Sequence, residues 1–193
     1  MKKIFVVWAA LLAVLVALAQ EKPADAQQQK AVEAYMKMGA VNENHEFMKK
    51  YAGNWQVQTT AWMAPGQPPA LSRSTARGEM ALGGRFLLMN FRGEMFGQPF
   101  EGMQIVGYDN LQKKYITFWI DSTSTFFFLT SGTRLGNTIN EAGFWPDPLT
   151  GAQVTVKART VWVGPDEYTY EQFMVMPDGS EFKSMENRCT RIK

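Results

Sequence analysis

The sequence predicts an all-β domain, a single antiparallel barrel of about ten strands that follows a short helical segment. From about residue 54 to the last residue, short stretches of alternating apolar and polar residues follow one another without a break. Each stretch ends at a cluster of Gly, Pro, Asn or Asp, and the links are mostly short, which forces neighbouring strands to run antiparallel. An up-and-down barrel leaves no open sheet edge. A two-sheet sandwich is the alternative, although the long crossovers of a Greek key are not visible.

The N-terminus has the parts of a cleavable signal peptide. Lys2-Lys3 is a charged start, and residues 4–18 form an apolar run that is too short for a typical membrane span. Ala17-Leu18-Ala19 is a small-x-small cleavage site, and Ala24-Asp25-Ala26 is an alternative site. We therefore expect residues 1–19 to be removed from a protein that is exported to a periplasm or secreted. The mature chain would then have no membrane span, whereas an uncleaved N-terminal anchor is the alternative.

Residues 20–42 are predicted to be a flexible and partly helical lead-in. Residues 20–30 are polar and rich in Gln, which favours flexibility. Residues 31–38 contain helix formers without a breaker before Gly39, so a helix is expected there.

A second short helix is predicted over residues 45–51, with Asn44 as its N-cap. Phe47, Met48 and Tyr51 lie on one apolar face of this helix. We expect that face to close one end of the barrel or to pack on its wall.

The barrel domain is predicted to span residues 43–193. Its strands are expected at residues 55–63, 74–82, 85–95, 100–108, 114–121, 125–133, 138–145, 153–163, 167–176 and 180–191. Asp109-Asn110, Gly136-Asn137 and Asp178-Gly179 are turn signals between neighbouring strands. Trp55, Trp119, Trp162 and Phe127 are expected inside, where such bulky side chains favour a small cavity or none.

Composition excludes several classes of function. The basic residues are scattered, with no stripe or long run, so we expect no nucleic-acid partner. Cys189 is the only cysteine, which excludes an intramolecular disulfide. His45 is the only histidine, no His/Cys cluster has zinc spacing, and no Gly-x-Ser-x-Gly elbow exists. We expect neither a metal nor a cofactor.

The last three strands are predicted to bring three charged residues together. With residues 177–180 as a hairpin loop, Glu171 lies opposite Glu186. With residues 164–166 as the preceding loop, Arg159 lies opposite Glu171. Paired carboxylates beside an arginine can form a general acid/base site, because like charges raise one pKa.

The composition of the two faces favours an outward charged row. The opposite face is the better interior, and it holds Val154, Val156, Ala158, Trp162, Tyr168, Tyr170, Met174, Met176, Met185 and Cys189. We therefore expect Arg159, Glu171 and Glu186 to form a solvated ladder outside the barrel, with Glu186 the less compensated carboxylate. A shift of one residue in either loop would reverse the faces.

A set of short motifs resembles a known family. Gly53-x-Trp55 with a late Arg191 is similar to the Gly-x-Trp signature of calycin barrels, in which the arginine packs over the tryptophan and closes one end. The wider pattern resembles the bacterial DUF1579 family, a domain of unknown function, over residues 43–192. It consists of His45-x-x-Met48, Leu82-Gly83-Gly84-Arg85-Phe86, Gly107-Tyr108-Asp109-Asn110, Trp119-x-Asp121-Ser122, Asp147-Pro148-x-Thr150-Gly151 and Pro177-Asp178-Gly179 to Lys183-x-Met185-Glu186.

The resemblance implies a calycin-like barrel, close to fatty-acid-binding-protein-like and nitrobindin-like barrels, but no established activity. Asn187 and Cys189 stand where we expect larger apolar or aromatic residues. Nitrobindin-like barrels hold haem through a histidine on a late strand. Because His45 precedes the first strand, we expect it to be a cap or packing residue instead.

Three functions are consistent with this sequence. The first is non-covalent binding or carriage of a small, largely apolar molecule inside the barrel. Its expected lining residues are Trp55, Trp119, Tyr168, Tyr170, Met174 and Met185. The second is a structural or interaction protein whose barrel is filled by its own side chains. The third is an enzyme that uses Arg159, Glu171 and Glu186.

Overall fold

A computed structural model describes residues 23–95 and 97–193. The predicted signal peptide, residues 1–19, lies outside the described residues. The chain divides into two units, residues 1–40 and residues 41–193, and each is described by itself.

The first unit contains helix α2 (Pro23–Met38), which begins earlier than the helix predicted over residues 31–38. Pro23 suits a first helical position because the N–H group that proline lacks would have no partner there. Asp25 in the first turn and Lys37 in the last turn have the charges that the helix dipole favours. Among the described residues, no helix is long and apolar enough to cross a membrane.

The second unit opens with helix α3 (Glu43–Met48) and the 3₁₀ helix η1 (Lys49–Tyr51). The N-cap of α3 is Asn42 and not the predicted Asn44, because the Asn42 side chain accepts a hydrogen bond from the backbone N–H of Asn44 at 2.9 Å. His45 completes a capping box by accepting the Asn42 backbone N–H at 3.1 Å.

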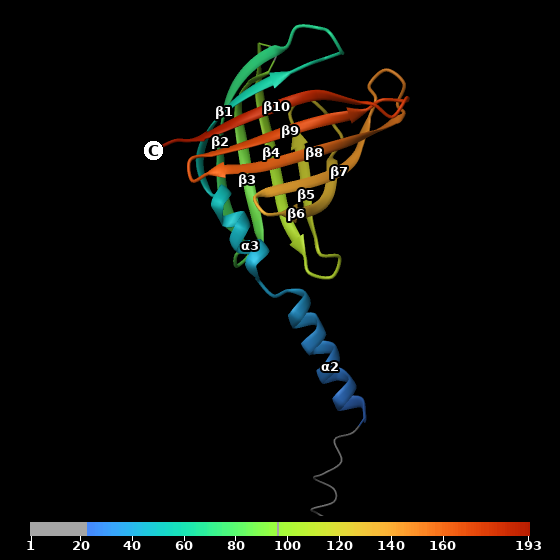
Figure 1. Cartoon of the computed structure of the whole chain (residues 1–193). Helices are drawn as coiled ribbons and strands as arrows, with labels where there is room; N and C mark the ends of the chain where they lie inside the picture. Colours follow the sequence, from blue (N-terminus) through green and yellow to red (C-terminus); the bar gives the residue numbers. More distant parts are fainter. Residues whose placement is uncertain (1–22, 96) are drawn as a thin grey trace, which may run out of the picture. The chain divides into compact units, whose positions relative to one another are not determined.

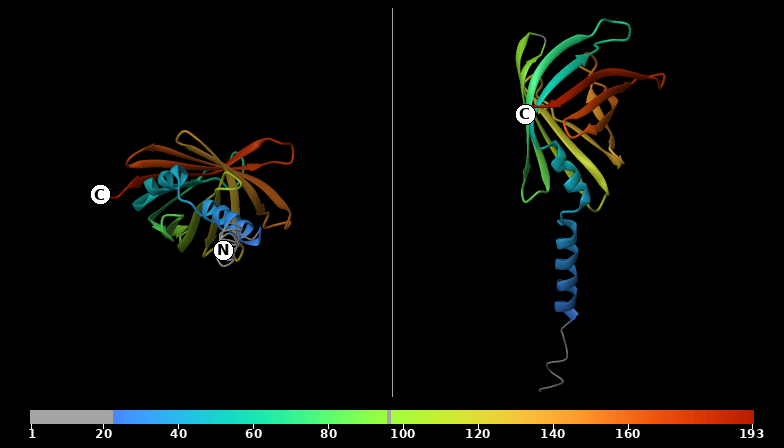
Figure 2. Two further views of the ribbon diagram at one scale, coloured as in Figure 1. Left: turned by 90° about the horizontal axis from the view of Figure 1, so that it is seen from below. Right: turned by 60° about the vertical axis from the view of Figure 1, so that its left-hand side comes forward.

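Ten strands follow and close into one barrel (Figures 1 and 2). They are β1 (Gly53–Ala61), β2 (Ala70–Ala81), β3 (Phe86–Met95), β4 (Gln98–Asp109), β5 (Lys114–Asp121), β6 (Phe128–Leu135), β7 (Thr138–Pro146), β8 (Gln153–Gly164), β9 (Glu167–Val175) and β10 (Glu181–Arg191). Each strand pairs antiparallel with its neighbours in chain order, and β10 pairs with β1. The predicted ten-stranded up-and-down barrel is therefore confirmed.

The alternation of side chains determines which residues lie inside. In β1, Trp55 and Val57 are buried, whereas Gln56 and Gln58 are exposed. Cross-strand partners share a face, so the register carries this assignment around the barrel. Trp55 and Val57, for example, lie opposite Arg191 and Cys189 of β10.

One end of the barrel is closed by aromatic side chains from α3, η1 and the nearest strand ends. Tyr51 makes edge contacts with the rings of Trp162 and Tyr168, and Trp55 makes edge contacts with the same two rings. Such pairs are typically worth about 0.5–1.5 kcal/mol each beyond the buried area. The predicted apolar face of the short helix thus becomes the plug of this closed end.

The outer wall of β5 and β6 is more apolar than alternation predicts. Phe118 and Leu129 are cross-strand partners on that wall. Phe127, which was expected inside, is 65% exposed and stacks on Phe118. The inward prediction for Phe127 was wrong, because β6 begins at Phe128, three residues later than predicted, and it is Phe128 that points inward and is buried.

Candidate functional site

Arg191 connects the segments that meet at the closed end of the barrel. Its guanidinium carbon lies 4.1 Å from the centre of the Trp55 ring, so the predicted contact is present. The same guanidinium donates hydrogen bonds to the backbone oxygens of Lys50, Ala52 and Pro165 at 2.8–2.9 Å. Gly53 has a φ of +116°, and a Cβ there would lie 2.6 Å from the Arg191 Nη1. These residues have a structural role at the closed end, so the chemistry of the interior depends on other residues.

The predicted charged row lies on the outer face. Arg159 pairs with Glu171 across β8 and β9, and Glu171 pairs with Glu186 across β9 and β10. The loops before and after β9 each differ from the prediction by one residue. Irregularities in the strand pairing at Val163 and Ser184 compensate for this, so the three charged residues still lie opposite one another as predicted.

Lys183 joins this row, which the sequence analysis did not anticipate. Its Nζ binds Glu171 and also Glu186, at 2.8 Å from the Glu186 Oε2. Glu186 still has less compensation than Glu171, as expected, because it pairs with Lys183 alone among the described residues, whereas Glu171 pairs with both Lys183 and Arg159. The irregularity at Ser184 is what brings Lys183 onto this face. Burial raises the pKa of Glu171, but hydrogen bonds from Lys183 and Arg159 outweigh this and lower the pKa overall. Glu171 therefore stays ionised near neutral pH, unlike a general acid.

A carboxyl group does point into the barrel, and it belongs to Glu141 of β7. Glu141 lies opposite Gly132 of β6 and Ala158 of β8. Its Oε1 accepts hydrogen bonds from the hydroxyls of Thr117, at 2.8 Å, and Thr130, at 3.3 Å. Strands β5, β6 and β7 thus each contribute one residue to a polar cluster on the inner wall.

Glu141 has no cationic partner among the described residues, and its pKa is set by burial and by the hydroxyls of Thr117 and Thr130. Burial raises its pKa, and the two threonine hydroxyls oppose this only in part. No described residue donates a hydrogen bond to its Oε2, and that atom is not among the fully buried unpartnered atoms. The Oε2 is therefore an open acceptor inside the barrel.

A second polar group lines the wall formed by β9 and β10. The Tyr170 hydroxyl donates to Gln172 at 3.1 Å, and the Gln172 amide donates to the Ser184 hydroxyl at 3.2 Å. Burial raises the pKa of Tyr170, and the charge of Glu141 raises it further. The charge of Glu141 on β7 therefore acts on the wall formed by β9 and β10.

Two further interior atoms are buried without a hydrogen-bond partner, the Tyr51 hydroxyl and the Asn187 Oδ1. Tyr51 is only 5% exposed, and the charge of Glu141 contributes to its raised pKa, after burial itself and the neighbours Tyr115 and Cys189. An unpartnered buried polar atom typically costs about 1–3 kcal/mol. Water or a bound molecule normally satisfies such atoms.

Several inward side chains keep accessible surface. Glu141 and Tyr170 are surrounded by protein, yet both keep part of their accessible surface. Trp119, Met174 and Met185 are also inward by register and only partly buried. The inner wall of the barrel is therefore not completely covered by other side chains.

The six predicted lining residues thus fall into two groups. Trp55 and Tyr168 are 0% and 5% exposed and belong to the packed closed end. Trp119, Tyr170, Met174 and Met185 point inward and retain accessible surface.

The sequence analysis missed Glu141, although a signal was present. Ile139, Glu141, Gly143 and Trp145 alternate along β7, so Glu141 shares a face with Ile139 and Trp145. A lone carboxylate on an apolar strand face is the pattern that could have identified it.

Thiol and metal chemistry find no support among the described residues. Burial raises the pKa of the Cys189 thiol to about 12, so it is not a nucleophile near neutral pH. His45 serves as a helix cap and meets the Tyr108 ring edge-on. Within residues 23–95 and 97–193, no group of three or more His, Cys, Asp or Glu could hold a metal ion.

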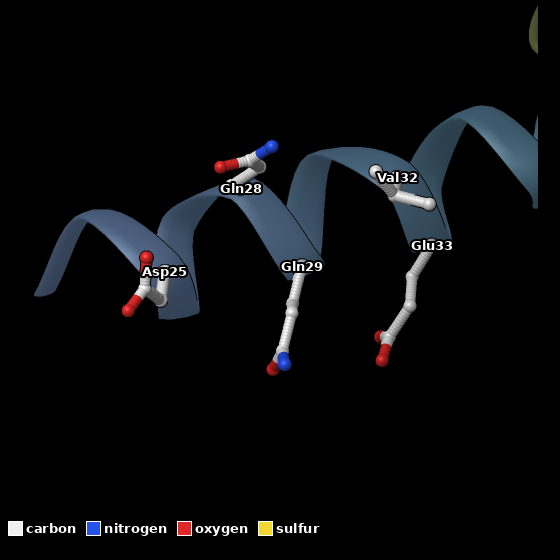
Figure 3. Close-up of a pocket in the computed structure, with 5 residues that line it drawn as sticks. All are labelled: Asp25, Gln28, Gln29, Val32 and Glu33. Atoms are coloured by element: carbon white, nitrogen blue, oxygen red, sulfur yellow. The ribbon is translucent and has the colours of Figure 1, made fainter. Parts of the chain in front are cut away.

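Figure 3 shows a hollow on α2 that is lined by Asp25, Gln28, Gln29, Val32 and Glu33. All five come from one helix, and no second element encloses the space. We assign no site to it, since binding sites are normally concave and enclosed.

A family profile matches residues 40–191, and its description is "Protein of unknown function (DUF1579)". The chain belongs to the DUF1579 family. The resemblance that the motifs indicated is therefore confirmed. Among curated proteins, none is significantly similar to this DUF1579 chain in sequence.

Solved structures support the fold. The crystal structure of Rv2717c from M. tuberculosis aligns with a TM-score of 0.56 and 12% identity, covering 80% of this chain and 100% of that one. A redesigned β barrel aligns at a TM-score of 0.42 and 14% identity, covering 76% and 95% of the two chains. At such low identity the Rv2717c likeness concerns the fold alone, and we draw nothing from the second.

Proposed function

We propose that this DUF1579 barrel binds a small amphipathic molecule non-covalently in its interior. The observation that carries the proposal is the Glu141 Oε2, an inward acceptor that receives no hydrogen bond from the described residues, in a barrel whose inner side chains keep accessible surface. The sequence predicted a largely apolar ligand. The polar atoms in mid-barrel favour instead a molecule with a polar group and an apolar body.

The apolar body would lie toward the end of the barrel opposite the plug. Met174 and Met185 point inward there, together with the ring of Trp145 and the buried Phe128. Methionine side chains adapt to ligands of different shape. This arrangement supports binding or carriage more than the self-filled alternative, in which the interior polar atoms would have their partners within the chain.

A fluorescence titration tests the proposal. N-phenyl-1-naphthylamine is uncharged and becomes fluorescent in apolar surroundings, so the barrel should bind it saturably. Thr160 points inward from β8 and Thr169 points outward from β9. Thr160→Trp should fill the interior and abolish binding, whereas Thr169→Trp should not. Circular dichroism would verify that both variants fold.

Absence of saturable binding to the wild type would contradict the proposal and favour the self-filled barrel. Equal loss in both variants would place the probe elsewhere. Mass spectrometry of organic extracts from the protein, purified from the compartment in which it accumulates, would then identify the natural ligand.

A further inference from the structure

We infer that the polar group of the ligand is a protonated amine, held by the carboxylate of Glu141. This inference rests on the proposed function, because it specifies the chemistry of the same interior. The hydrogen bonds around Glu141 are the first observation that supports an amine. The hydroxyls of Thr117 and Thr130 both donate to its Oε1, an arrangement that suits an ionised carboxylate. The free Oε2 can then only accept, so the site selects a hydrogen-bond donor.

The charges inside the barrel favour a cationic donor. Asp121 is a second inward carboxylate, on the same face of β5 as Trp119, and its Oδ2 accepts the Trp119 indole N–H at 2.7 Å. Arg134 also faces inward, but it is held at the closed end by the Tyr115 hydroxyl and the Gly136 backbone oxygen. No cation among the described residues pairs with Glu141.

An uncompensated carboxyl in a poorly hydrated interior has two states. It either takes up a proton or takes a counter-ion from a ligand. A ligand ammonium group supplies that counter-ion. A carboxylate of a fatty acid would instead bring a second negative charge beside Glu141, which costs free energy in such surroundings.

The surroundings of Glu141 suit an ammonium group as well. Two aromatic side chains, of the kind whose ring faces attract cations, point inward here, Tyr170 from β9 and Trp119 from β5. We therefore expect an amphipathic amine, with its charged end in mid-barrel and its apolar body toward Met174 and Met185.

A matched series of competitors tests this inference. Octylamine, octanol and octanoic acid share one chain length and differ in their polar end. Each would be titrated against N-phenyl-1-naphthylamine bound to the full-length protein. We expect octylamine to compete at least about ten-fold better than octanol, because an ionic hydrogen bond replaces a neutral one. Octanoic acid should be the weakest.

Two variants show which carboxylate is responsible. Glu141→Gln keeps the shape but removes the charge, so it should abolish the preference for octylamine and leave octanol binding within about two-fold. Glu171→Gln removes a carboxylate on the outer face and should leave the preference unchanged. If Glu141→Gln does not fold, the three competitors measured on the wild-type protein still test the inference.

Octanoic acid competing as well as octylamine would overturn the inference. So would an amine preference that survives in Glu141→Gln or that falls equally in Glu171→Gln. If the probe binds saturably but no amine preference appears, the amine inference fails and the proposed function stands. If neither the probe nor octylamine binds, as judged by fluorescence and calorimetry, both fail.

Discussion

Arg191 shows how much one side chain can contribute at the closed end. It stacks on Trp55 and also donates to three backbone oxygens in two segments, those of Lys50 and Ala52 before β1 and that of Pro165 between β8 and β9. A cation–π contact and charge-assisted hydrogen bonds together are worth about 2–4 kcal/mol. Arg191→Ala should therefore lower the free energy of unfolding by about that amount and leave the far-UV circular dichroism unchanged.

Arg188 provides the control for this prediction. It also lies on β10, but it is exposed and pairs only with Glu167 on the surface. Arg188→Ala should change the free energy of unfolding by less than about 1 kcal/mol. Equal effects of the two substitutions in urea denaturation would show that the closed end does not depend on Arg191.

Glu171 should stabilise the fold at neutral pH. Its pKa is lowered below the ordinary value of 4.5, because the hydrogen bonds from Lys183 and Arg159 outweigh the effect of burial. A lowered carboxyl pKa contributes stability above the unfolded-state value, and this stability is lost as pH falls through the folded-state pKa. Glu171→Gln should cost about 1 kcal/mol at pH 7, and the cost should vanish in acid. A cost that persists at low pH would mean that packing, not charge, is responsible.

Glu141 should have the opposite effect. Burial raises its pKa above 4.5, so the folded state binds a proton more tightly than the unfolded chain. The protein without ligand therefore loses stability as pH rises through the raised pKa. Glu141→Gln should increase the free energy of unfolding at neutral pH by up to about 1–3 kcal/mol and have little effect in acid. A destabilised Glu141→Gln at every pH would contradict the uncompensated state that we describe.

These two glutamates show what the sequence could predict of the site. Glu171 was identified because the predicted loops on either side of its strand placed it opposite Arg159 and Glu186. Glu141 was not, since it has no charged residue near it in sequence and its hydrogen-bond donors, Thr117 and Thr130, come from other strands. An isolated interior polar residue becomes recognisable only when the neighbouring strands are in place.

At the scale of the strands, β6 and β7 approach one another unusually closely beside Glu141. A Cβ on Gly132 would overlap the backbone oxygen of Asn140. Because that obstacle is backbone, the strands themselves would have to shift. Gly132→Ala should therefore reduce the free energy of unfolding by about 1–3 kcal/mol and disturb binding in the interior.

Gly164 is the matched control at the end of β8. A Cβ there would meet nothing within 4 Å, and its φ is not positive. Gly164→Ala should be neutral within about 1 kcal/mol. If thermal unfolding shows equal effects for both glycines, the close approach of β6 and β7 does not restrict the chain as described.

Element boundaries show where sequence patterns are informative. The ends of β5 were predicted at the observed residues, 114 and 121, because turn residues bound it on both sides. The two loops flanking β9 were each one residue out, since a β-bulge leaves no clear sequence signal. The charged row was still placed correctly because the irregularities at Val163 and Ser184 restored the register.

For the whole molecule, the closed barrel followed from the sequence because most links are short and nearly every strand ends at a turn residue. The alternation of apolar and polar residues did not predict most of the polar side chains that lie inside the barrel. The middle of the barrel is polar: Thr117, Thr130, Glu141 and Gln172 face inward, in addition to Tyr170, which was expected there. Alternation assigns such residues outside by default, so a polar interior is visible only in the closed structure.

Export is the last expectation that can be checked at this scale. The charged start, the apolar run over residues 4–18 and the Ala17-Leu18-Ala19 site predict cleavage before Gln20. The alternative cleavage, before Gln27, would remove the first turn of α2, which begins at Pro23. N-terminal sequencing of the protein recovered from outside the cytoplasm should show Gln20 or Gln27 first. Intact residues 1–19 on the exported protein would instead support an uncleaved anchor.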